Sequence, residues 1–206
     1  MNDRYICYIG RPSYQKNTFF FVDVVEKVHR VQPDLKFYLL GVGYYSPDLE
    51  RLKVAIISKG LENVITLMPW LSHAETLKYV KGAQIYLTTA IYEGLPLAVI
   101  EAMSLGKAIV ASNVIGNKDC VDQGRNGFLV QADDADGFAE KINILLDNFE
   151  LRKYMEHQSR KLFEERFLIN RRICELKRIY RLIGGGKSFV VVYNLHVAQA
   201  ERRWAA

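Results

Sequence analysis

The chain has 206 residues, of which 50% are hydrophobic and 25% are charged, a globular composition that excludes a disordered, collagenous or coiled-coil protein. Its length suits one α/β domain and does not fit a two-domain enzyme with a full cleft between its domains. Residues 1–150 carry 15 basic and 18 acidic side chains, a net charge of −3, whereas residues 151–206 carry 13 and 5, a net charge of +8.

Short apolar runs recur along the first 130 residues and predict strands. Most of these runs are apolar at every position, as expected for strands of a parallel sheet that helices cover on both faces. The predicted strands are Tyr5–Gly10, Lys36–Gly41, Val64–Met68, Ala83–Thr89, Ala108–Ser112 and Gly127–Val130.

Segments with helical periodicity alternate with the apolar runs. Each has a start or stop signal, such as Ser72 as N-cap with Glu75 three residues later, or a glycine just after the helix. The predicted helices are Thr18–Val31, Asp48–Lys59, Ser72–Val80, Pro96–Leu105 and Asp134–Asp147.

The alternation of strands and helices predicts an α/β fold, a doubly wound, mainly parallel Rossmann-like sheet with flanking helices. Ligands bind such sheets at the carboxyl ends of the strands, so the informative residues are expected in the loops that follow them. Those loops are residues 10–17, 41–47, 68–72, 89–96 and 112–119.

The C-terminal part divides into two segments. Phe149–Ile183 is helical and basic, and is interpreted as a pair of surface helices with solvated Lys and Arg side chains. We expect the nucleotide-binding domain to cover residues 1–183. Residues 184–206 are interpreted as a Gly-rich linker and a tail that is peripheral or swapped.

Several functional classes are disfavoured. Because the basic excess lies in the C-terminal quarter, the charge does not indicate nucleic-acid binding. Three widely spaced cysteines, Cys7, Cys120 and Cys174, favour neither a disulfide framework nor a zinc site. Without a leader-like N-terminus or an uninterrupted run of 18 apolar residues, a cytoplasmic protein is expected, with peripheral contact to the inner membrane face left open.

The loop after the first strand, GRPSYQKN, is the first candidate for chemistry. Arg11 and Lys16 stand five residues apart, and Asn17 is placed to cap the following helix. Two cations beside a helix N-terminus form a plausible phosphate clamp, because the unpaired N–H groups there already favour negative charge. Two ordinary surface charges are the alternative reading.

The second candidate is TTAIYEGLPLAVIEAMSLG, which follows the fourth strand. Pro96 suits the first position of a helix, and Gly94 lets a ligand approach the backbone closely. The open N–H groups of residues 95–98 would then face the sheet edge and cradle a diphosphate. Glu93 and Glu101 suit sugar hydroxyls, since a carboxylate would repel phosphate.

The segment YEGLPLAVIEAMSLGKAIVASNVIGNKDCVDQGRNGFLV resembles the signature region of the family-4 retaining glycosyltransferases, with Glu93 and Glu101 as the glutamates of the E-x7-E pattern. GRPSYQKN is similar to the GRL-x-x-x-KG loop of that family, and KFYLLGVG to its second-strand glycine turn. The resemblance covers roughly residues 5–183. It implies one half of a GT-B fold, the C-terminal, donor-binding domain, without its N-terminal acceptor domain.

The resemblance also implies site roles. Arg11 and Lys16 would bind the donor diphosphate, Glu101 the ribose hydroxyls, and the backbone of Gly94, Leu95, Pro96 and Leu97 the distal phosphate. Glu93 would lie beside the transferred sugar and is the candidate catalytic residue. The sequence departs from the family pattern at Asn17 and Asn117, where the family commonly has glycine, so the path of the loop after Ser112 is open.

The implied reaction transfers a sugar from a UDP- or GDP-sugar to a hydroxyl of an acceptor glycan or glycolipid, with retention and without a metal or other cofactor. Synthesis of a cell-surface polysaccharide or glycoconjugate is the expected setting. A truncated, non-catalytic nucleotide-sugar-binding module and an unrelated NAD enzyme remain as alternatives. The base pocket is expected at Gly41–Tyr45 and Met68–Leu71.

Other motifs are set aside. Gly186-Lys187-Ser188 lacks the first glycine and the preceding strand of a P-loop, and Gly41-Val42-Gly43 has Ser46 where a dinucleotide fingerprint needs a third glycine. His73, at a helix start, is interpreted as a surface residue, as are His29 and His157. The sequence has no GxSxG motif and no recognisable nucleophile arrangement.

Overall fold

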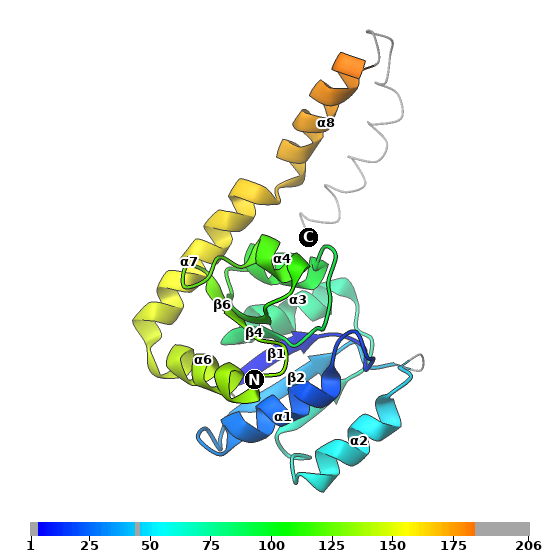
Figure 1. Cartoon of the computed structure of the whole chain (residues 1–206), viewed down its shortest axis with the longest axis vertical. Coiled ribbons are helices and arrows are strands. Elements are labelled where there is room, and N and C mark those ends of the chain that lie inside the picture. The colour runs from blue at the N-terminus through cyan, green and yellow to red at the C-terminus, as the bar shows by residue number, and fades with distance from the viewer. Residues whose placement is uncertain (1–3, 44–45, 184–206) are drawn as a thin grey trace. The chain divides into compact units, whose positions relative to one another are not determined.

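The computed structural model describes residues 4–43 and 46–183 (Figure 1). The strands are β1 (Tyr5–Ile9), β2 (Lys36–Leu40), β3 (Ile65–Met68), β4 (Ile85–Thr88), β5 (Ala108–Ser112) and β6 (Gly127–Val130). The helices are α1 (Thr18–His29), α2 (Leu49–Ser58), α3 (His73–Gly82), α4 (Leu97–Ser104), α5 (Ile115–Cys120), α6 (Ala135–Asp147), α7 (Phe149–Arg166) and α8 (Ile169–Ile183).

The six strands form one sheet in the order β3-β2-β1-β4-β5-β6, and every pairing is parallel. The order reverses between β1 and β4, which are direct neighbours with Ile6 opposite Ile85. This is the doubly wound arrangement that the alternating pattern predicted, and the fold class is confirmed. The carboxyl ends of β1 and β4 therefore meet at the point where such sheets bind ligands.

Helices cover the sheet because its strands are apolar at nearly every position. β4 and β5 are buried throughout, and only one residue of β1 is partly exposed. Helix α1 packs against α2 and α6, while α3 packs against α4. The result is a layered core with its strands in the middle (Figure 1).

Element ends differ from the expected ones in two informative places. Pro96 takes the N-cap position and α4 begins at Leu97, one residue later than predicted. The segment after β5, expected to be a loop, contains the short helix α5. Glycine and asparagine within this segment are poor helix formers, and six residues are too few to give a periodic signal. Tertiary contacts therefore decide that α5 is helical.

Helix α7 is not simply a surface helix with solvated charges. Arg152 is 8% exposed, and its guanidinium donates to the carbonyl oxygens of Leu145 (2.6 Å) and Leu146 (3.3 Å). Those carbonyl groups lie in the last turn of α6, where carbonyl oxygens have no N–H partners within the helix. Burial of this side chain corrects the sequence interpretation at this position. Lys153 and Lys161 are exposed as expected.

The chain divides into two compact units, one ending at Glu165 and one beginning at Arg166. Within the second unit, α8 exposes Leu176, Ile179 and Tyr180 alongside basic residues. In the part of the chain that the structure describes, no helix has the length and apolarity needed to cross a bilayer. The tail 184–206 and its glycine run lie outside the described residues.

Candidate functional site

The loop between β1 and α1 turns through a left-handed residue. Asn17 has φ +51° and ψ +49°, and its side chain makes no capping hydrogen bond. The prediction that Asn17 caps α1 through its side chain is therefore wrong. Asparagine is among the non-glycine residues that best tolerate the left-handed conformation, so it fits the position where the motif that this loop resembles has glycine.

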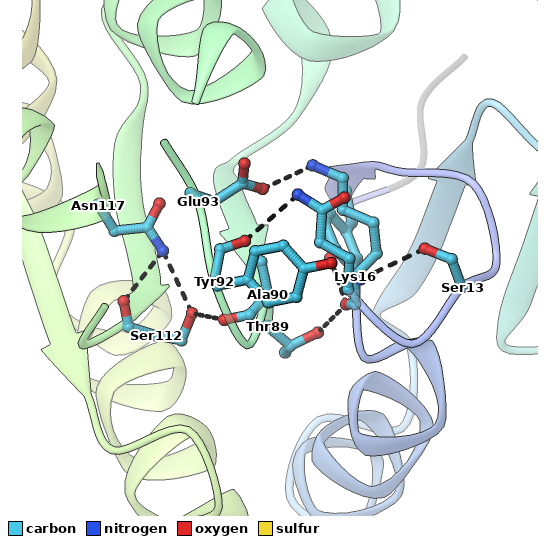
Figure 2. A network of polar contacts seen from close by, with 10 residues as sticks. Ser13, Lys16, Thr89, Ala90, Tyr92, Glu93, Ser112 and Asn117 are labelled. Atoms are coloured by element: carbon cyan, nitrogen blue, oxygen red, sulfur yellow. Dashed lines mark hydrogen bonds and ion pairs between the residues drawn. The ribbon is translucent and has the colours of Figure 1, made fainter. Parts of the chain in front are cut away.

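Lys16 and Glu93 form an ion pair at the carboxyl edge of the sheet. The Lys16 Nζ lies 2.6 Å from Glu93 Oε1, although the two residues are 77 positions apart. Their side chains are 22% and 9% exposed, so this contact is largely shielded from water. Figure 2 shows the two side chains facing each other across the end of the sheet. The sequence placed both residues in one site but did not predict that they would pair.

Two buried hydroxyls hold the backbone that carries Lys16. Tyr8 donates to the Lys16 carbonyl oxygen at 2.5 Å, and Thr89 Oγ1 lies 3.2 Å from the carbonyl oxygens of both Lys16 and Asn17. Burial raises the pKa of the Tyr8 hydroxyl well above its usual value, so it stays protonated and remains a donor. Neither residue was singled out from the sequence, since isolated Tyr and Thr carry no motif.

The loop after β5 closes the other side of the site. Ser112 donates to the Ala90 carbonyl oxygen, and Asn117 Nδ2 donates to Ser112 Oγ at 3.2 Å and to its carbonyl oxygen at 3.0 Å (Figure 2). A Cβ at Gly116 would come within 2.5 Å of the Gly94 carbonyl oxygen, so α5 lies directly against the turn after Glu93. Asn117 is fully buried, which resolves the path that the sequence left open.

The turn into α4 has fewer open N–H groups than expected. The Leu97 N–H donates to the Leu95 carbonyl oxygen at 2.9 Å, and Pro96 has no N–H. Within the described residues, the N–H groups of Gly94, Leu95 and Ala98 are the ones left without a hydrogen-bond partner at this turn. A Cβ at Gly94 would meet no atom within 4 Å, so the space beside it is open.

Glu101 contacts a histidine that the sequence analysis set aside. His73 Nε2 lies 2.9 Å from Glu101 Oε1, with the two side chains 48% and 20% exposed. His73 is therefore a surface residue, as interpreted, that also contacts a candidate site residue. The signal was present, because the capping box of Ser72 and Glu75 sets the start of α3 and so places His73 just after the loop that follows β3, at the carboxyl edge.

The expected base pocket is only partly described, because residues 44–45 lie outside the described part. Trp70 is 68% exposed and covers Gly43, where a Cβ would lie 2.4 Å from the indole Cδ1. The loops after β2 and β3 are therefore in contact. Arg11 is exposed and forms no ion pair with any described acidic residue.

Comparison with known proteins identifies the family of the chain. The sequence profile of the family "Glycosyl transferases group 1" matches residues 1–162. The chain belongs to this family. It is 26% identical over 179 residues to the alpha-D-kanosaminyltransferase of Streptomyces kanamyceticus, covering 87% of this chain and 46% of that one. The chain is also 26% identical to the Escherichia coli UDP-Gal:alpha-D-GlcNAc-diphosphoundecaprenol alpha-1,3-galactosyltransferase, over 84% of this chain and 44% of the relative.

Solved glycosyltransferases share the fold. Staphylococcus aureus TarM, crystallised with UDP, superposes with a TM-score of 0.79 at 22% identity, over 86% of this chain and 35% of TarM. Sucrose-phosphate synthase of Thermosynechococcus elongatus gives 0.82 at 20% identity, over 90% of this chain and 47% of that one. The chain spans about half the length of the curated relatives it matches.

The site of this group 1 transferase offers charge and hydrogen bonds, and no activated nucleophile is evident among the described residues. It presents Lys16, two carboxylates and the open turn into α4 along one sheet edge. Burial raises the pKa of Cys7 well above its usual value, so this thiol is neutral and enclosed. The arrangement suits binding of an anionic ligand that also carries hydroxyl groups.

Proposed function

We propose that this chain is the donor-binding half of a retaining GT-B glycosyltransferase that uses a UDP- or GDP-sugar. One observation supports the proposal most strongly: the ion pair of Lys16 and Glu93 stands beside the open turn into α4. The reacting end of a nucleotide sugar consists of two phosphates and a hydroxylated ring. The cation and the free N–H groups suit the two phosphates, and the carboxylate suits the hydroxyl groups of the ring.

In this proposal the diphosphate binds between Lys16, Arg11 and the N–H groups of Gly94 and Leu95. Binding draws the Lys16 ammonium from Glu93 toward the phosphate, because phosphate carries more charge and more acceptor atoms than one carboxylate. The N-terminal end of α4 adds a favourable dipole. Charge on the departing diphosphate is then neutralised by the chain itself, and we propose that no metal ion is needed.

The two glutamates take separate hydroxyl groups. Glu101 accepts hydrogen bonds from the ribose diol, and Glu93 accepts from the transferred sugar once Lys16 has turned to the phosphate. In the reaction the anomeric C–O bond to the diphosphate breaks, a new bond forms from the acceptor oxygen on the same face, and the acceptor proton leaves with the diphosphate or solvent. Stabilisation of that leaving group supplies most of the rate.

We further propose that transfer needs an acceptor-binding domain beside this one. The matches to about half of each curated relative support this reading. A single wall leaves the donor open to water, whereas efficient transfer needs the acceptor oxygen held about 3 to 3.5 Å from the anomeric carbon. The acceptor is proposed to be a glycan or glycolipid of a cell-surface polysaccharide or glycoconjugate, reached from the cytoplasm or the inner membrane face.

A thermal-shift panel tests the donor site. UDP, GDP, ADP and their sugars are added to the 206-residue chain at millimolar concentration in EDTA, and UDP or GDP is expected to raise the melting temperature. No shift with any nucleotide refutes the donor-site proposal. A binding module without turnover is distinguished by radiolabelled donor: transfer that stays absent after an acceptor domain is added supports the module.

A further inference from the structure

Two hydroxyls are buried at the carboxyl ends of the two central strands. Tyr8 belongs to β1 and is 1% exposed, while Thr89 follows β4 and is fully buried. Most of the surrounding core is apolar, so a buried hydroxyl is costly unless it has a hydrogen-bond partner. Both hydroxyls find their partners in the same loop, the one that carries Lys16.

The partners are two consecutive carbonyl groups. Tyr8 donates to the Lys16 oxygen. Thr89 Oγ1 lies within hydrogen-bond distance of the Lys16 oxygen (Figure 2) and of the Asn17 oxygen. Because the backbone of Asn17 is in the left-handed conformation, the chain turns sharply here. Because both carbonyl oxygens are hydrogen-bonded to buried hydroxyls, the orientation of the backbone at Lys16 and Asn17 is fixed.

The side chain of Lys16 is held as well. A Cβ on Gly10 would lie 3.1 Å from Lys16 Cγ, so the lysine stem lies close against the glycine backbone. The loop that carries Lys16 is also hydrogen-bonded to the segment that carries Glu93, since the Ile91 N–H donates to the Gln15 carbonyl oxygen at 2.9 Å. The backbone and the aliphatic stem of Lys16 are therefore both restrained, which limits the positions that its ammonium can take.

We infer that Tyr8 and Thr89 are positioning residues for Lys16, which fix its backbone and so keep its ammonium within reach of the donor diphosphate. This inference rests on the proposed function of the site. A free lysine side chain loses conformational entropy when it is ordered against a phosphate. A lysine whose backbone is already fixed loses less on binding, so its contact with the diphosphate is stronger.

A double-mutant cycle tests the inference in the 206-residue chain, with UDP and uridine as probes in calorimetry. Tyr8→Phe is expected to weaken UDP binding about three- to tenfold, as for loss of one neutral hydrogen bond, and to leave uridine binding unchanged. In the Lys16→Ala background the same substitution is expected to have no effect on UDP. That loss of effect marks a residue that acts through Lys16, because general destabilisation would persist in both backgrounds.

Matched variants separate positioning from folding. Tyr5→Phe removes another hydroxyl from the same strand, one that donates to the Tyr79 oxygen, and is expected to leave UDP affinity unchanged. If Tyr8→Phe does not fold, Thr89→Val takes its place in the cycle, and Thr89→Ser, which keeps the hydroxyl, is expected to retain affinity.

The outcomes distinguish this inference from the donor-site proposal. Unchanged UDP affinity in Lys16→Ala overturns the donor-site proposal and this inference with it. If Lys16→Ala weakens UDP but Tyr8→Phe and Thr89→Val do not, or do so equally in both backgrounds, the positioning role alone is overturned.

Discussion

The two carboxylates of the site are held in different ways. Glu93 is 9% exposed and pairs with Lys16, whose backbone is bonded to two buried hydroxyls. Glu101 is 20% exposed and contacts His73, a side chain that is 48% exposed at the start of a surface helix. One half of the site is built from buried polar groups and the other from a contact near solvent.

This difference has an energetic consequence. A polar contact near solvent contributes little, because water competes for both groups and the side chains lose freedom; even an exposed ion pair contributes only about 0 to 1 kcal/mol. Removing one partner of a shielded pair costs more, because the remaining charge stays where it is only partly hydrated. Substitutions on the Lys16 side are therefore expected to change binding and stability more than substitutions on the His73 side.

The largest effect is expected from Lys16→Ala. It removes the cation that we assign to the diphosphate, and a hydrogen bond to a charged group is worth about 1.5 to 3 kcal/mol, or about 10- to 150-fold in affinity. Calorimetry with UDP and uridine should show the loss for UDP alone. Lys16→Met keeps the stem against Gly10 and should show the same loss, which excludes altered packing as its cause. Equal losses for UDP and uridine would contradict the assignment.

Glu93→Gln is expected to act in the opposite direction. The variant frees Lys16 from its carboxylate partner and removes a negative charge near the diphosphate, so UDP should bind tighter, by up to about tenfold. Transfer by the chain together with its acceptor domain should fall, since Glu93 is the residue proposed to lie beside the sugar. Weaker UDP binding in this variant would mean that the ion pair supports the site and does not compete for Lys16.

Effects no larger than that of Glu93→Gln are expected at the ribose half. Glu101→Gln should weaken UDP about three- to tenfold and leave 2′,3′-dideoxy-UDP nearly unchanged, since that analogue lacks the hydroxyls. His73→Ala should show the same selectivity with a smaller loss, while His73→Gln keeps a donor and should recover part of it. Equal losses for both nucleotides would make Glu101 a structural residue.

The smallest effect is expected from the capping box that places His73. Hydrogen bonds from the Ser72 side chain and backbone lower the pKa of Glu75 below its ordinary value of 4.5. A carboxyl group whose pKa is lower in the folded state stabilises the fold at pH values above its ordinary pKa. That stabilisation is lost as the pH falls through the lowered pKa. Melting temperatures of wild type and Glu75→Gln should therefore differ slightly at neutral pH and converge in acid. A difference that grows in acid would contradict this role.

Much of the fold was readable from local pattern. Continuous apolar runs such as Ala108–Ser112 predict buried parallel strands because only a sheet covered on both faces can accommodate them. The capping box at Ser72 was also predicted and is present. Neither α5 nor the left-handed Asn17 could be predicted, because six weakly helical residues and one asparagine take their conformation from what they pack against.

Sequence alone determined the order of the elements apart from α5, the edge of the sheet at which the site is proposed, and the family resemblance carried by the motifs around Glu93 and Glu101. The order of the elements follows from periodicity, which is a property of short stretches of chain, whereas the resemblance rests on whole motifs in their order along the chain. Only the tertiary structure decided that Lys16 pairs with Glu93, that His73 meets Glu101, and that Tyr8 supports the lysine loop. The partners in the first two of these contacts are 77 and 28 residues apart, and the order of the strands together with the packing of the loops and helices that follow them brings them together.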